Sequence, residues 1–230
     1  MPRKSDLRSA FADSAPVGLA LVPLGLAFGV LVVQAGLDWW WAGVSAALVY
    51  AGSFEFLLIG MVTAAAPLTA IAAAALMVNF RHVFYALSFP LDRIRGRAGR
   101  AYATFALTDE AYALTASERA RAWTGRRVLY SQLFMHLYWT GSATVGALLG
   151  GLIPEGVQGL DFALTALFTV LALDALRDLR GEVSTPVLAF ASALAAWVLF
   201  PDQMLLVAFS LFTAGLLAHR LVLRRKPAHV

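Results

Sequence analysis

The 230-residue chain contains no cysteine, and charged residues make up only 14% of it. Without cysteine it cannot form a disulfide, a thiolate metal site or a cysteine-based catalytic centre. The usual signatures of soluble enzymes are missing as well: there is no GxSxG, no Walker loop, no HExxH and no dinucleotide fingerprint. The four histidines are scattered along the chain. We therefore predict that the protein is not an enzyme and holds no resident metal or cofactor.

Hydrophobic residues, in contrast, make up 60% of the chain, and the mean hydropathy is +0.73. Ordinary soluble domains contain roughly 45–50% apolar residues. Several apolar stretches reach the roughly 20 residues that a helix needs to cross a bilayer, and none shows the alternation of a transmembrane barrel. The basic residues lie in short segments between these stretches, which indicates cytoplasmic loops rather than a nucleic-acid-binding surface. We predict one all-α integral membrane domain over residues 1–230, with no nucleic-acid partner.

The distribution of arginines predicts how the chain crosses the bilayer. Apolar stretches at 16–34, 42–65 and 67–90, taken as plain spans from an inside N-terminus, would put the arginine-rich loop 92–100 outside. If 42–65 instead enters from outside, turns at Gly52–Glu55 and returns, those arginines lie in the cytoplasm, as the positive-inside rule requires. We therefore predict a broken or re-entrant segment at 42–65.

A second broken segment is predicted at 101–116, which is short for a span, has Thr108-Asp109-Glu110 at its centre and is flanked by arginines on both sides. Further spans are expected at 128–152, 161–176, 184–200 and 203–222. The resulting fold has about six full transmembrane helices plus two broken or re-entrant segments that open to opposite faces, with residues 1–14 and 223–230 in the cytoplasm. The alternative is a fold of seven plain spans. Paired interruptions of this kind indicate a transporter site.

Arg81 lies near the middle of the apolar stretch 67–90. An ionisable residue at that depth costs about 2.5–3.5 kcal/mol on insertion scales, so such residues usually face a protein interior or a hydrated pathway. The planar guanidinium can grip a carboxylate with two hydrogen bonds, which suits an amino acid substrate. The alternative for Arg81 is snorkelling to the membrane surface.

Glu55 is the second charge within an apolar stretch, in the Gly-Ser-Phe-Glu-Phe break. A buried carboxylate there can receive a substrate ammonium, carry a proton or form a structural ion pair with Arg81. Gly52 can add helix-end N–H groups that attract an anion. All three roles of Glu55 stay open at this point.

The remaining polar candidates lie beside the two breaks. His82 can relay protons, or it can simply hydrogen-bond to a neighbouring helix. Asp109 and Glu110 can form a gate or a proton or cation site, or they only stabilise a helix start capped by Thr108. Tyr85 follows Arg81 by four residues and His82 by three, so it extends the polar stripe on one helix face.

Five stretches together resemble the AzlC-like branched-chain amino acid permease family, the large subunit of AzlCD-type exporters. They are Pro23-Leu-Gly-Leu-Ala-Phe-Gly29, Tyr50-Ala-Gly-Ser-Phe-Glu-Phe56, Val78-Asn-Phe-Arg-His-Val-Phe-Tyr85, Leu107-Thr-Asp-Glu110 and Asp161-Phe-Ala-Leu164. Many members have glutamine in an Ala-Gly-Ala-Ser-Gln-Phe pattern where this chain has Glu55. This departure leaves the substrate and the proton coupling open.

The resemblance implies export of branched-chain amino acids from the bacterial cytoplasmic membrane, in a complex with a small AzlD-like membrane subunit. Together with the charges it predicts that Arg81 holds the substrate carboxylate, while Glu55 or Asp109 meets the ammonium. The substrate is expected to contact Gly52, Ser53, Phe54, Glu55, Phe56, Asn79 and Arg81. Proton coupling or gating is expected at Glu55, His82, Asp109 and Glu110. The alternatives are a non-transporting interaction subunit and an exporter of another small amphipathic solute.

Overall fold

The computed structural model describes residues 5–152, 169, 173, 183–201 and 204–225. The chain divides into two compact units, one made of residues 1–71 and 78–161, the other of residues 72–77 and 162–230. Most of the predicted span 161–176 lies outside the described residues. All the predicted site residues lie in the first unit.

Every regular element of the described residues is a helix, which confirms the all-α class. The first unit contains α1 (Asp6–Gln34), α2 (Trp39–Leu48), α3 (Gly52–Thr63), α4 (Leu68–Asn79, shared with the second unit), α5 (Arg81–Ala86), η1 (Leu91–Arg93), α6 (Arg97–Phe105), α7 (Asp109–Ala116), η2 (Glu118–Ala122) and α8 (Gly125–Gly150). The second unit contains α10 (Ser184–Leu199) and α11 (Met204–Arg225).

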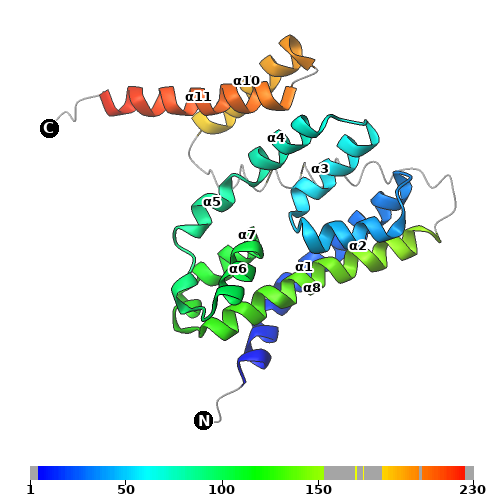
Figure 1. Cartoon of the computed structure of the whole chain (residues 1–230). Coiled ribbons are helices and arrows are strands. Elements are labelled where there is room, and N and C mark those ends of the chain that lie inside the picture. Colours follow the sequence, from blue (N-terminus) through cyan, green and yellow to red (C-terminus); the bar gives the residue numbers. More distant parts are fainter. Residues whose placement is uncertain (1–4, 153–168, 170–172, 174–182, 202–203, 226–230) are drawn as a thin grey trace. The chain divides into compact units, whose positions relative to one another are not determined.

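The first unit is built on α1 and α8, which lie side by side and run in the same direction (Figure 1). Phe11 packs against Phe134 near the two helix starts, and Gly29 meets Gly146 near the ends. A Cβ at Gly29 or Gly146 would overlap a backbone carbonyl oxygen of the other helix. Small residues of this kind let helix backbones approach closely without a hydrophobic driving force, as in membrane bundles.

The predicted interruption of 42–65 is present, but it lies slightly earlier than expected. Helix α2 ends at Leu48 and α3 begins at Gly52, so the break is formed by residues 49–51. Tyr50 has a φ of 48° there, in the left-handed region that ends helices. Gly52–Glu55 is the first turn of α3 rather than the turn itself. The reason is local: the Glu55 side chain accepts a hydrogen bond from the Ala51 N–H and so stabilises the start of α3.

The predicted span 67–90 is not one continuous helix, which corrects the expectation. It is interrupted at Phe80, between α4 and α5, and η1 follows α5. Phe80 keeps helical dihedral angles, and its carbonyl accepts from the Val83 N–H at 3.2 Å, in a tighter turn than that of an α-helix. Arg81 and Tyr85 just beyond it both contact Asp109 of α7. Polar tertiary contacts therefore accompany this irregular turn. A hydropathy pattern contains no information about such contacts.

The second predicted break, in 101–116, is confirmed. Helix α6 ends at Phe105, and α7 begins at Asp109. Thr108 caps α7, as expected, because its hydroxyl accepts a hydrogen bond from the Ala111 N–H at 3.4 Å. Gln132 of α8 covers the other side of the break, donating to the carbonyl oxygens of Ala103 and Ala106 at 2.9 Å each.

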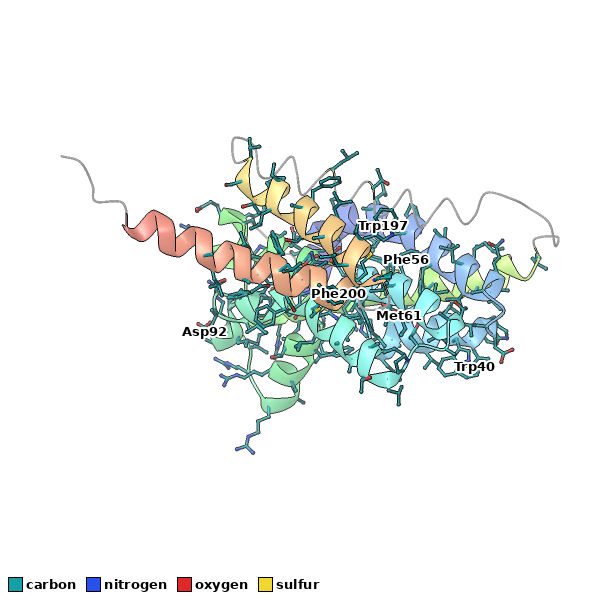
Figure 2. All side chains as sticks on the ribbon, turned by 90° about the horizontal axis from the view of Figure 1, so that it is seen from above. Trp40, Phe56, Met61, Asp92, Trp197 and Phe200 are labelled. Atoms are coloured by element: carbon teal, nitrogen blue, oxygen red, sulfur yellow. The ribbon has the colours of Figure 1, made fainter. Side chains whose placement is uncertain are left out.

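The two ends of the first unit differ in chemistry. Figure 2 shows Trp40 and Asp92 at opposite ends of it. The exposed tryptophans 39–41 suit a membrane interface. The Asp92 end also carries the ion pair between Arg127 and Asp13, with a nitrogen–oxygen distance of 2.6 Å.

One described helix, α1, is long and apolar enough to cross a membrane by length and composition. Shorter apolar helices occupy Gly52–Thr63, Leu68–Asn79, Ser184–Leu199 and Val207–Ala218. In the second unit α10 packs against α11, where Leu188 lies against Gly215. The number of membrane crossings therefore stays a prediction.

Candidate functional site

Helix α8 presents a polar face to both broken segments. Gln132, His136 and Trp139 follow each other at spacings of four and three residues, which places them on one side of the helix. Gln132 holds the end of α6, as described above, and Trp139 reaches the start of α3. We call these three residues the α8 polar face.

The two chain breaks meet at His136. The ring of Tyr50, from the first break, lies 4.3 Å from the His136 ring between centroids. The ring of Phe105, the last residue before the second break, lies 5.7 Å from it. Tyr102 completes the junction, with its hydroxyl 3.2 Å from His136 Nδ1, in a hydrogen bond between α6 and α8. The tips of two segments that are far apart in sequence are thus placed together, halfway along α8.

Glu55 lies one helical turn along α8 from this junction, and only 1% of its surface is exposed. Its Oε2 accepts two hydrogen bonds, from Trp139 Nε1 at 2.9 Å and from the Ala51 N–H at 3.0 Å. Its Oε1 is buried and has no hydrogen-bond partner among the described residues. A carboxyl group can accept more bonds than this, so Glu55 has unused capacity.

A cavity of about 350 Å³ opens beside Glu55, between α1, α2 and α3. Apart from Ser45 and Glu55, every residue that lines it is apolar or aromatic. Phe28 forms part of the wall, and its ring stacks at 5.8 Å on the ring of Trp139. We call this space the Glu55 cavity. An apolar cavity with very few polar groups is the usual form of a small-molecule site.

The other residues of the 52–56 motif support this cavity without lining it. Phe54 and Phe56 are buried, and the Phe56 ring packs at 5.4 Å against the ring of Phe28. Gly52 lies against Trp139, where a Cβ would be 3.3 Å from the indole ring. Ser53 is half-buried in the first turn of α3. Phe54 and Phe56, which the sequence predicts to contact the substrate, do not line this cavity; its wall is formed by Phe28, Trp41 and aliphatic residues.

A second polar site, the Asp109 cluster, joins α5 to α7 through Arg81, His82, Tyr85 and Asp109. Arg81 Nη2 lies 2.5 Å from Asp109 Oδ2, and the Tyr85 hydroxyl donates to Asp109 Oδ1 at 2.9 Å. His82 Nε2 lies 3.7 Å from the same Oδ1. The polar stripe predicted for Arg81, His82 and Tyr85 therefore converges on one carboxylate. The Arg81 and Asp109 side chains are 48% and 39% exposed.

Glu55 and Arg81, for which the sequence left an ion pair open, have different partners in the structure. Arg81 forms its ion pair with Asp109, and in the described part of the chain no ion pair involves Glu55. The structural pair between Glu55 and Arg81 is therefore not formed. Asn79 ends α4 next to the Phe80 interruption, and Glu110 is half-buried in the first turn of α7. Within the described ranges no cluster of His, Asp and Glu side chains is placed to hold a metal ion.

Sequence reasoning missed the residues that connect these sites, namely Tyr50, Tyr102, Gln132 and Trp139. A signal for Gln132 and Trp139 was present, because polar and aromatic residues repeat every three or four positions along the apolar helix α8. Tyr50 carried no such signal, since its contact with His136 joins residues far apart in the sequence.

Residues 16–153 match the AzlC protein family. That range contains the α8 polar face, the Glu55 cavity and the Asp109 cluster. The chain is 33% identical over 171 residues to the branched-chain amino acid transport protein AzlC of Bacillus subtilis strain 168. This alignment covers 73% of the chain and 66%, just under two thirds, of the Bacillus protein.

More complete alignments connect the chain to two other relatives. It is 31% identical over 223 residues to an uncharacterised membrane protein of Helicobacter pylori strain J99, covering 94% of the chain and 97% of the relative. It is 24% identical to the inner membrane protein YgaZ of Escherichia coli K12, covering 86% and 84%. No solved structure matches the chain.

Proposed function

The chain belongs to the AzlC family, and from that premise we propose that it is a membrane transporter of branched-chain amino acids. It acts as the large subunit of a two-component exporter, together with a small AzlD-like membrane subunit. It lies in the bacterial cytoplasmic membrane with both termini in the cytoplasm. Transport is secondary-active, since the sequence contains no Walker loop. The chain carries out no enzymatic reaction.

The observation that carries this proposal is the junction of two chain breaks at His136, next to a buried carboxyl and an apolar cavity. Irregular backbone at membrane depth is tolerated where it is buried in protein or lines a cavity, and transporters place substrate sites at broken helices. Tyr50 and Phe105 come from opposite broken segments, so a movement of either segment changes the junction. Such a movement can expose the cavity to one side of the membrane at a time.

In the proposed mechanism Glu55 receives the ammonium of the substrate, and the Glu55 cavity receives its aliphatic side chain. Arg81 holds α5 to α7 through its ion pair with Asp109. In the proposed mechanism this ion pair opens when α5 and α7 separate. A substrate carboxylate can replace Asp109 as the partner of Arg81, since both carboxylates fit the guanidinium fork. We assign proton coupling to Glu55 or to the Asp109 cluster, with Glu110 beside it.

The competing function, a non-transporting interaction subunit, requires Glu55 and Arg81 to contact a partner. Arg81 is exposed enough to do so, but Glu55 is almost fully covered by its own chain. A cross-linking map of the two-subunit complex separates the two functions. Cross-links that place position 55 at the subunit interface would favour the interaction role.

The direct test is efflux of preloaded labelled leucine, valine and methionine from cells that produce the chain with and without the neighbouring small membrane protein. We expect saturable efflux that needs both proteins and decreases strongly in the Glu55→Gln and Arg81→Ala variants. Glu118→Gln, at an exposed surface position, is the matched control and should export normally. Wild-type rates in the first two variants, at equal abundance in the membrane, would contradict the assigned roles.

The proposed topology can be tested because the chain contains no cysteine, so each introduced cysteine is a unique probe. We expect a membrane-impermeant maleimide to label Trp40→Cys in intact cells, and Arg95→Cys only after permeabilisation. Labelling of both positions in intact cells would contradict the predicted orientation.

A further inference from the structure

The Glu55 cavity has an unusually simple polar lining. Its two polar residues are Ser45 and Glu55, and the Ser45 hydroxyl donates to the Ala42 carbonyl oxygen at 3.3 Å. The Ser45 hydroxyl is thus shared between its own helix and the nearby Glu55 carboxyl. Glu55 is the ionisable residue of the lining, so a charged group of a ligand would interact with it.

One oxygen of Glu55 has no hydrogen-bond partner among the described residues. Oε2 is engaged by Trp139 and Ala51, which also fixes the orientation of the carboxyl group. Oε1 is buried without a partner in the described part of the chain. Leaving a buried polar atom unpaired costs about 1–3 kcal/mol, and more for a charged group, so a hydrogen-bond donor that enters the cavity can recover that free energy.

The charge of the site restricts which end of an amino acid it can accept. A ligand carboxylate next to an ionised Glu55 would meet a like charge, and the start of α3 already holds the Glu55 carboxyl itself. Arg81 forms its ion pair with Asp109, not with Glu55. A cationic donor is therefore favoured at Glu55, and a second anion is disfavoured.

The shape and lining of the cavity determine the rest of the ligand. Val32, Leu58 and Ile59 supply aliphatic surface from two helices, and the volume of about 350 Å³ lies at the small end of ligand sites. A short branched alkyl group fills such a space favourably, because each buried methylene contributes about 0.8 kcal/mol. No Arg, Lys or His lines the cavity, so its wall offers no cationic partner for a carboxylate.

We propose that the Glu55 cavity recognises a primary ammonium on a short branched aliphatic body, and that the ligand's carboxylate is dispensable for binding there. Isoamylamine, which is leucine without its carboxylate, then occupies the cavity as leucine does. This inference rests on the proposed function insofar as leucine is taken as a substrate. The binding of the amine can be measured without any transport.

The test uses the full chain, purified with its small subunit, and displacement of labelled leucine by two compounds with the same alkyl body. Isoamylamine carries the amine alone, and 4-methylpentanoate carries the carboxylate alone. We expect isoamylamine to displace leucine and 4-methylpentanoate to be at least about tenfold weaker, the size of one charge-assisted hydrogen bond. Direct binding of labelled isoamylamine is measured in parallel.

Three variants link the result to the cavity. Glu55→Gln should weaken isoamylamine binding about tenfold or more, whereas the control Glu118→Gln should leave it unchanged. Leu58→Phe fills the cavity from its apolar side and should reduce isoamylamine and leucine binding together. The Leu58→Phe variant keeps the test decisive if the Glu55 variant does not accumulate in the membrane.

The outcomes separate the inference from the proposed function. If leucine is transported but 4-methylpentanoate displaces it as well as isoamylamine does, or isoamylamine does not bind, the inference is overturned and the function remains. If isoamylamine binds through Glu55 but no amino acid is exported, the inference remains and the function is overturned. Absence of both binding and transport by inserted, assembled protein would reject both.

Discussion

Glu55 and Asp109 are both carboxylates at the start of a helix that follows a chain break, yet their surroundings differ. Glu55 is 1% exposed, receives two neutral N–H donors and keeps one oxygen unpaired within the described residues. Asp109 is 39% exposed and has Arg81, Tyr85 and His82 around it. The first group has unused binding capacity beside an apolar cavity, whereas the second is satisfied by its own chain. We infer that Glu55 binds the ligand and that Asp109 holds two segments together.

The largest expected effect comes from removing the carboxyl group at the ligand-binding position. Glu55→Ala deletes the acceptor for the substrate ammonium and leaves Trp139 Nε1 without its partner. We expect leucine efflux at low substrate concentration to fall by about 100-fold, and by less in Glu55→Gln. Initial efflux rates at equal protein abundance measure this. If Asp109→Ala reduces efflux more than Glu55→Ala, the two roles are exchanged.

A smaller effect is expected when the ion pair of the Asp109 cluster is removed. Arg81→Ala should reduce efflux about tenfold. Arg81→Lys should retain more activity, because lysine keeps the positive charge although it lacks the planar guanidinium that forms two hydrogen bonds. A double-mutant cycle with Asp109→Ala should give a coupling of about 0.5–1 kcal/mol in unfolding free energy, since both side chains are partly exposed.

The Arg121 and Glu118 pair supplies the control for that cycle. It has a similar nitrogen–oxygen distance, 2.7 Å, but its side chains are 73% and 79% exposed. We expect its coupling to be close to zero. Equal coupling in the two pairs would show that the Asp109 cluster gains nothing from its partial burial and its additional Tyr85 hydrogen bond.

A weaker effect is expected for Trp139→Phe, which keeps an aromatic ring against Phe28 but removes the N–H donor to Glu55. The orientation of the carboxyl group is then held by Ala51 alone. We expect substrate affinity to fall about fivefold, the size of one neutral hydrogen bond of about 1 kcal/mol. Displacement of labelled leucine measures the change. An unchanged affinity would mean that Trp139 only packs against its neighbours.

The smallest effect is expected for Gly52→Ala. The added Cβ would lie 3.3 Å from the Trp139 ring, so the ring has to move by a few tenths of an ångström. We expect destabilisation of less than about 1 kcal/mol, because Ala also favours the helix that starts at this position. Thermal unfolding measures this. A loss of several kcal/mol would show that the Trp139 ring cannot move without disturbing Glu55.

Two of the structural features could be predicted closely from residue patterns. The break in 101–116 was indicated by three adjacent polar residues at the centre of a short apolar stretch, and Thr108 is the cap that its chemistry predicts. The polar stripe of Arg81, His82 and Tyr85 was indicated by their helical spacing, although their shared partner Asp109 was not. Both depend on interactions within a few residues, which local sequence records.

The interruption at Phe80 could not be predicted in this way. No proline or glycine lies between residues 68 and 89, so hydropathy favoured one continuous span. The polar groups just after Phe80 find their partner in α7, more than twenty residues further along the chain. A local pattern contains no information about such a partner.

The sequence by itself determined the all-helical class, the presence of both breaks, the family and the candidate charged residues, because these follow from composition, spacing, motifs and capping chemistry. Only the tertiary structure decided which charge meets which partner. It paired Arg81 with Asp109 instead of Glu55, placed Trp139 on Glu55 and brought Tyr50 and Phe105 to His136. The physical reason is that these contacts are made between helices, where close packing of small residues, rather than distance along the chain, determines which side chains meet.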